Sequence, residues 1–139
     1  MKRALVLLAE DYRPVAEALV ALLKTEFEVA EPVEDGLALL EAASKLHPDV
    51  IVADISMPRL DGLGALARLK QINPAVKVVL ITMYGEQAFV DIALKAGASG
   101  LVLKHSAALE LVPAVRAALD GNYYVSAAFA SRRGKRVGP

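Results

Sequence analysis

The sequence predicts an α/β fold, a doubly wound parallel sheet of five strands with helices on both faces. Short apolar runs alternate five times with longer segments of helical spacing along the 139 residues. The runs are apolar at nearly every position, which is typical of strands covered on both sides. Right-handed crossovers between parallel strands then place the helices in two layers. A chain of this length is expected to form one domain.

The five predicted strands differ in how completely apolar they are. Four are nearly continuous apolar runs, at residues 4–9, 50–53, 76–81 and 100–103. The fifth, at residues 28–31, has a shorter apolar run of two residues, which is flanked by glutamates. A short, charged strand is typical of a sheet edge, so we expect residues 28–31 at one edge.

The segments between the strands predict five helices. Asp35 and Asp61 stand where helix N-caps belong, and Gly97 and Gly121 follow the last helical positions of two segments. The apolar positions that mark the helices are Val15, Leu19, Leu22 and Leu23; Leu37 and Leu40; Leu63, Leu66 and Leu69; Phe89, Ile92, Ala93 and Ala96; and Leu109, Val112, Val115, Ala118 and Leu119.

Composition excludes several classes of protein. The chain has no cysteine, which excludes a disulfide scaffold, thiolate metal sites and a cysteine nucleophile. No apolar run approaches the roughly 20 residues of a membrane span, and no signal peptide is recognisable, so we expect a cytoplasmic protein without a membrane partner.

Charge is unevenly distributed along the chain. Acidic and basic residues number 16 each, but four basic residues come after Ser131, so the rest of the chain is net acidic. An acidic body is a poor surface for phosphate contacts, and we therefore expect no nucleic-acid binding by this chain alone. We interpret residues 1–121 as the folded domain and residues 122–139 as a linker or tail. The four basic residues are Arg132, Arg133, Lys135 and Arg136.

Polar side chains stand at the ends of the strongest strands. In doubly wound sheets, ligands bind beyond the carboxyl ends of the strands, where these side chains meet. Each alone has an ordinary explanation: Asp11 can cap a helix, Thr82 is a good strand residue and Lys104 is a common polar strand end. Their coincidence at one edge indicates a functional site. The residues are Glu10, Asp11, Asp54, Thr82 and Lys104.

The chemistry of this set points to a cation and to phosphoryl transfer. Three gathered carboxylates repel one another unless a cation offsets them, and Mg²⁺ needs few protein oxygens because it keeps several waters. A carboxylate beside a metal, a hydroxyl and an ammonium can accept a phosphoryl group, and Asp54 is the best nucleophile candidate. His47 and His105 are too isolated to form a metal-ligand set, and no triad, P-loop or dinucleotide fingerprint is present.

The pattern resembles the receiver domain of bacterial two-component response regulators, from about Arg3 to Leu119. The matching pieces are Glu10-Asp11, Asp54-Ile55-Ser56-Met57-Pro58 with Asp61-Gly62, Thr82 and Lys104. The resemblance implies a flavodoxin-like fold with strand order 2-1-3-4-5. Residues 97–100 and 121–126 also resemble the subgroup whose receivers precede a LuxR-type helix-turn-helix, and we expect that output domain to lie outside this chain.

The resemblance also implies a role for each residue. Asp54 would be the phosphoacceptor, Lys104 would pair with the phosphoryl group and Thr82 would be the switch hydroxyl. Asp11, Asp54 and the backbone carbonyl of Ser56 would bind Mg²⁺, with Glu10 acting through water. The implied partners are a sensor histidine kinase and a second copy in a phosphorylation-dependent homodimer. The domain would phosphorylate and dephosphorylate itself to control transcription rather than act as a turnover enzyme.

Two departures from the family pattern affect the switch. Leu101 stands where the family usually has an aromatic residue, which predicts a weaker or different coupling to the output surface, and His105 replaces the common proline. Two alternatives stay open. An aspartyl-phosphate phosphatase is disfavoured because Ser56 stands where a second acid is usual. A pseudo-receiver that binds partners without phosphorylation is disfavoured by the complete residue set, although Leu101 is compatible with it.

Overall fold

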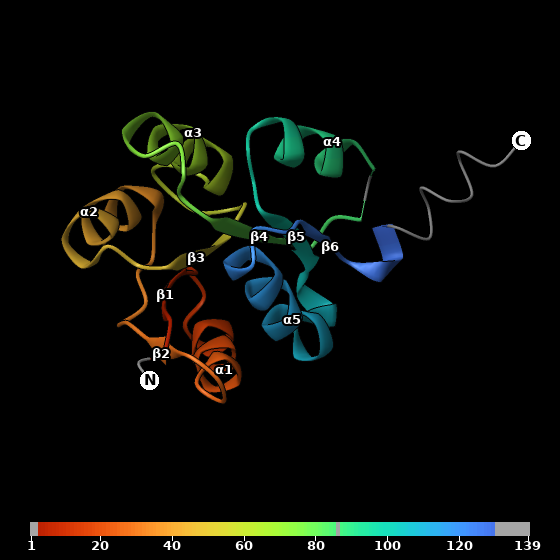
Figure 1. The fold of residues 1–139 in the computed structure, drawn as a ribbon, viewed down its shortest axis with the longest axis horizontal. Coiled ribbons are helices and arrows are strands. Elements are labelled where there is room, and N and C mark those ends of the chain that lie inside the picture. The colour runs from red at the N-terminus through yellow and green to blue at the C-terminus, as the bar shows by residue number, and fades with distance from the viewer. Residues whose placement is uncertain (1–2, 86, 130–139) are drawn as a thin grey trace, which may run out of the picture.

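The computed structural model describes residues 3–85 and 87–129 of the chain. Strands and helices alternate as the sequence predicts, and a central sheet separates α2, α3 and α4 on one face from α1 and α5 on the other (Figure 1). In chain order the elements are β1 (Leu5–Ala9), α1 (Arg13–Leu23), β2 (Glu28–Val29), α2 (Gly36–Leu46), β3 (Val50–Asp54), α3 (Gly62–Ile72), β4 (Val78–Thr82), α4 (Gln87–Lys95), β5 (Gly100–Leu103), the 3₁₀ turn η1 (Lys104–Ser106), α5 (Ala107–Leu119) and β6 (Tyr124–Val125).

The sheet is parallel throughout and its strands run in the order β2-β1-β3-β4-β5-β6. This confirms the predicted order 2-1-3-4-5, with β2 at one edge. In the register, Asp54 pairs with Ile81 and Thr82 pairs with Leu103. The carboxyl ends of the central strands therefore meet at one edge of the sheet.

The core lies on both faces of the sheet. Alternate residues of each central strand point to opposite faces, so Leu7 and Ile51 pack with the α2, α3 and α4 side, whereas Leu8 and Val52 pack with the α1 and α5 side. All residues of β3, β4 and β5 are buried, as expected for strands between two helical layers. Slipping any of these strands by one residue would exchange its two apolar faces, which fixes the strand ends in place.

The predicted helix boundaries have local causes. Asp35 accepts a hydrogen bond from the backbone N–H of Ala38 at 2.8 Å, and Asp61 accepts one from Gly64 at 2.7 Å. Both carboxylates therefore cap their helices as predicted. Gly97 has φ 97° at the end of the α4 segment, a left-handed conformation that favours glycine.

A sixth strand, which the sequence analysis does not predict, follows α5. Residues Tyr124 and Val125 pair with β5 in parallel, and Phe129 is fully buried in the core. The packed part of the chain therefore reaches Phe129 among the described residues. Residues 130–139, with the four basic residues, lie outside the described residues, so the assignment of residues 122–139 as a linker or tail stays a prediction.

The helices are short compared with a membrane span. The longest is α5, with 13 residues. Within residues 3–85 and 87–129, no helix has both the length and the hydropathy to cross a bilayer.

Candidate functional site

The fold brings the five polar residues of the strand ends to one edge of the sheet. Glu10 and Asp11 follow β1, Asp54 and Thr82 are the last residues of β3 and β4, and Lys104 directly follows β5. Because β1, β3, β4 and β5 are parallel, their carboxyl ends lie together although the residues are far apart in sequence.

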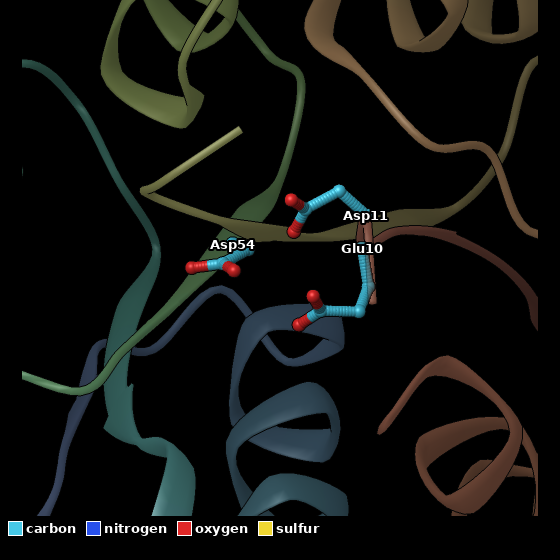
Figure 2. Close-up of side chains that lie close together, drawn as sticks. All are labelled: Glu10, Asp11 and Asp54. Carbon is cyan, nitrogen blue, oxygen red and sulfur yellow. The ribbon is translucent and has the colours of Figure 1, made fainter. Parts of the chain in front are cut away.

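Three carboxylates form the centre of the site. One oxygen of each of Glu10, Asp11 and Asp54 lies within 4.8 Å of the others. Figure 2 shows the carboxylates of Glu10 and Asp11 extending toward Asp54. Glu10 is 1% exposed and Asp54 4%, whereas Asp11 is exposed. The cluster therefore joins two buried charges to one that faces solvent.

Lys104 offsets the charge of the two buried carboxylates. Its Nζ lies 2.7 Å from Glu10 Oε1 and 2.7 Å from Asp54 Oδ2. Burial lowers the pKa of Lys104, but its hydrogen bonds to Asp54 and Glu10 outweigh burial, so the net shift of this pKa is upward. Burial raises the pKa of Glu10, although the hydrogen bond from Lys104 opposes the shift. The ammonium thus stays charged beside the acidic cluster.

Backbone donors orient both buried carboxylates. The Tyr12 N–H donates to Glu10 Oε2 at 3.0 Å, and the Ser56 N–H donates to Asp54 Oδ1 at 3.1 Å. With Lys104 on Oδ2, each Asp54 oxygen has one defined donor. Asp54 is therefore held in a single orientation, which favours its attack on an incoming group.

Gly62 lets α3 begin directly against the strand that carries Asp54. A Cβ atom at Gly62 would lie 2.4 Å from the backbone oxygen of Asp54, a distance no side chain tolerates. The Gly62 N–H also donates to the Ile55 carbonyl at 2.8 Å. Gly62 belongs to the motif that follows the third strand in the sequence, but its role could not be predicted because its contact with Asp54 appears only in three dimensions.

Thr82 is buried beside the site and points its hydroxyl to the backbone. Its Oγ1 accepts a hydrogen bond from the Tyr84 N–H at 3.1 Å. Tyr84 itself is 51% exposed, and its ring stacks on Phe89 with centroids 5.6 Å apart. Leu101, at the usual aromatic position, is fully buried. Ser56 is exposed, and a role for its carbonyl in binding metal stays a prediction.

The acidic cluster fits a hard divalent cation. Such ions take carboxylate and carbonyl oxygens as ligands, and Mg²⁺ is commonly held by one or two carboxylates plus waters. Asp11 and Asp54 supply two of these, and the exposure of Asp11 leaves access for water.

Comparison with known proteins identifies the family. The family model for the response regulator receiver domain matches residues 6–116. The chain belongs to the response regulator receiver domain family. Receiver domains are signalling domains, and the strand order and acidic cluster found in this one agree with that membership.

Several relatives resemble this receiver domain closely. The transcriptional regulatory protein DegU of Brevibacillus brevis is 35% identical over 122 residues, which cover 86% of this chain and 52% of DegU. The receiver thus spans about half the length of that relative. A two-component response regulator of the LuxR family from Aurantimonas sp. SI85-9A1 has a TM-score of 0.92 at 29% identity, covering 99% of this chain and 100% of that structure.

A third relative was solved with a phosphomimetic. The isolated receiver domain of RcsB from Salmonella enterica serovar Typhimurium, in the presence of BeF₃⁻, has a TM-score of 0.83 at 25% identity. The match covers 94% of this chain and 98% of that structure. The predicted resemblance to receivers of the LuxR subgroup is confirmed.

Proposed function

We propose that this receiver domain accepts a phosphoryl group on Asp54 from a phosphohistidine of a sensor histidine kinase. The observation that carries the proposal is the setting of Asp54: a buried carboxylate at the site edge, oriented by Ser56 N–H and Lys104, beside the acidic pair of Glu10 and Asp11. This setting supports a nucleophile and a neighbouring cation in one place.

The transfer step is a substitution at phosphorus. A carboxylate oxygen of Asp54 forms the new bond to phosphorus, and the bond between phosphorus and the kinase histidine nitrogen breaks. The electron pair of that bond returns to the imidazole, and Asp54 becomes an acyl phosphate. Lys104, already 2.7 Å from Asp54, stays beside the new phosphoryl oxygens and offsets their charge.

Mg²⁺ would be held by Asp11, Asp54 and the Ser56 carbonyl, with Glu10 acting through water, and it would neutralise charge on the phosphoryl oxygens. Glu10 and Asp11 also have roles that do not involve the metal. Glu10 keeps Lys104 charged and in place through their 2.7 Å ion pair. Asp11, the exposed member of the cluster, leaves the approach to Asp54 open to solvent and to a partner.

Signal output would begin at Thr82. Its hydroxyl leaves the Tyr84 N–H and turns to the phosphoryl group, which biases a two-state equilibrium of the domain. We propose that this controls transcription in the cytoplasm through a DNA-binding domain, because the relative DegU is a longer transcriptional regulatory protein, and that it alters homodimerisation. The domain turns over no external substrate in this account.

Intact-mass spectrometry after incubation with acetyl phosphate and Mg²⁺ tests the proposal. We expect one added phosphoryl group in the wild type and none in Asp54→Asn or without Mg²⁺. Asp91→Asn, at an exposed site in α4, is the matched control and should be phosphorylated normally. A folded wild-type chain that gains no phosphoryl group and binds no BeF₃⁻ would contradict the proposal and favour a pseudo-receiver.

A further inference from the structure

We propose that residues 122–129 form a strap whose docking on β5 reports the state of Thr82, so that phosphorylation releases the strap. This inference rests on the proposed function, since it assigns the output of that same site. The strap contains β6 and Phe129 and is the last part of the chain that the structure describes.

The strap is attached to β5 by a short series of hydrogen bonds. The Tyr124 N–H donates to the Ser99 carbonyl at 3.1 Å, and the Ser126 N–H donates to the Leu101 carbonyl at 2.9 Å. The next bond uses a side chain: the Leu103 N–H donates to Ser126 Oγ at 2.9 Å. Ser126 is fully buried, so its hydroxyl satisfies a donor that water cannot reach.

This side-chain bond connects the strap to the phosphorylation site. Leu103 pairs with Thr82 in the sheet register, and Lys104 directly follows Leu103. A shift of Thr82 toward Asp54 therefore acts on the one β5 residue whose N–H depends on Ser126. The path from Thr82 to Ser126 runs through adjacent groups, and networks of this kind can carry coupling between sites.

Phe129 supplies an aromatic ring on the face of β5 that carries Leu101. Phe129 is fully buried and belongs to the same core cluster as Leu101, Leu103, Val90 and Ala93. Leu101 stands where receivers usually carry an aromatic residue. Phe129 is the fully buried aromatic residue of that cluster, and Phe89 of α4 packs against the cluster partly buried. The strap therefore shares one packed cluster with β5 and α4, and it is placed to respond when they rearrange.

The carboxylate of Glu110, in α5, provides a second attachment for the strap. Glu110 Oε1 accepts hydrogen bonds from Tyr124 Oη and from the Ala127 N–H, both at 2.9 Å. The strand itself has only two residues. Such a small unit, fixed by few bonds, can open locally while the rest of the domain stays folded.

The structure shows one arrangement of the strap and the site. The strap is docked while Thr82 Oγ1 accepts a hydrogen bond from the Tyr84 N–H and Lys104 donates one to Asp54. In the proposed switch the phosphorylated state has the strap undocked, so a ligand that favours that state shifts the population toward undocking. Undocking would carry the signal to segments beyond Phe129.

Hydrogen exchange on the full chain tests the strap. We expect the amides of Tyr124, Ser126 and Phe129 to exchange about fivefold faster or more when BeF₃⁻ and Mg²⁺ are added, in line with usual coupling energies. The amide of His47, which donates to Ala43 at the end of α2, should not change.

Two variants separate coupling from simple packing. Ser126→Ala removes the acceptor for the Leu103 N–H. The strap amides of this variant should therefore exchange hydrogen rapidly without BeF₃⁻, and adding BeF₃⁻ should change their rates little. Because coupling is reciprocal, Ser126→Ala should also bind BeF₃⁻ several-fold more tightly. Tyr123→Ala, at a neighbouring residue that is 74% exposed, should leave both measurements unchanged.

The possible results separate a failure of the strap proposal from a failure of the proposed function. If BeF₃⁻ binds but the strap amides exchange hydrogen at an unchanged or slower rate, the strap proposal is overturned and the proposed function stays intact. Unaltered BeF₃⁻ affinity in a folded Ser126→Ala chain would also overturn the strap proposal. Failure of the wild type to bind BeF₃⁻, judged by the amide signals around Asp54, would overturn the proposed function and the strap with it.

Discussion

Lys104 is the residue on which the electrostatics of the site depend. It forms ion pairs of 2.7 Å with Glu10 and with Asp54, both of which are buried. Charges taken out of water are tolerated when they are paired, and removing one partner of a buried pair is costly because the other charge stays behind. Lys104 is therefore needed both for the stability of the domain and for the chemistry of the site.

Replacing Lys104 by methionine should destabilise the domain by about 3 kcal/mol, because Glu10 and Asp54 then face each other uncompensated. Urea unfolding without Mg²⁺ measures the loss. Lys95→Met, at an exposed residue in the last turn of α4, should change stability by less than about 0.5 kcal/mol. The double variant Lys104→Met with Glu10→Gln should recover part of the loss, and equal losses in the single and double variants would contradict the pairing.

Tyr124 gives the strap a dependence on alkaline pH. Burial, together with the hydrogen bond to Glu110, raises the pKa of Tyr124 from 10.0 to about 12. Because the pKa of Tyr124 is higher in the folded than in the unfolded state, the protonated hydroxyl stabilises the fold. This contribution is fully present below pH 10 and is lost as the pH rises toward 12. The stability difference between wild type and Tyr124→Phe in urea should therefore shrink across this range. A constant difference would contradict the role of the hydroxyl.

The positions of the site residues could be predicted from the sequence because they depend on strand ends. Asp54 and Thr82 are the last residues of apolar runs, and parallel strands bring such positions together. The contributions of Gly62 and Ser126 could not be predicted. Gly62 matters through its close approach to the Asp54 carbonyl, and Ser126 matters through its hydrogen bond with the Leu103 N–H; both contacts appear only in three dimensions.

At the scale of elements, the start of α3 sets the geometry of the loop after β3. Gly62 allows this helix to begin against the Asp54 backbone, and Asp61 caps it. The residues between Asp54 and Asp61 include Arg59, whose φ of 67° is unusual for a residue with a side chain. The loop that carries Ser56 is therefore held between a buried strand and a fixed helix start.

Gly62→Ala should lower the free energy of unfolding by about 1–3 kcal/mol, since its Cβ would overlap backbone that cannot move freely. It should also slow phosphorylation by acetyl phosphate, because Asp54 would be displaced. Gly64→Ala is the matched control: its Cβ would meet the Leu60 Cδ1 side-chain atom at 2.7 Å, which can shift. Equal effects of both substitutions, by urea unfolding and phosphorylation rate, would contradict the proposed contact.

The helices and strands were predictable to different degrees. Nearly continuous apolar runs identify the central strands, and the aspartate caps identify two helix starts. The sixth strand escapes prediction because Tyr124 and Val125 are too few to show a period, and only pairing with β5 orders them. Leu109 continues the apolar spacing of the fifth helix but is 84% exposed, because the buried face passes through Leu111 and Val115 instead.

The whole molecule carries equal numbers of acidic and basic residues, so copies of the chain do not repel one another through net charge at pH 7. We expect BeF₃⁻ with Mg²⁺ to raise the weight-average mass in sedimentation equilibrium, as a phosphorylation-dependent homodimer requires. Asp54→Asn should stay at its starting mass under the same conditions. A wild-type chain that binds BeF₃⁻ without any change in mass would contradict regulated dimerisation.

Chemical trapping would show which residue carries the phosphoryl group, which we propose to be Asp54. The chain is phosphorylated with acetyl phosphate and Mg²⁺, reduced with borohydride and digested, and the peptides are sequenced by mass spectrometry. Borohydride reduces an aspartyl phosphate to homoserine, so we expect homoserine at position 54 alone. Homoserine at position 11 or 61 instead, or phosphate on a hydroxyl such as that of Thr82, would contradict it.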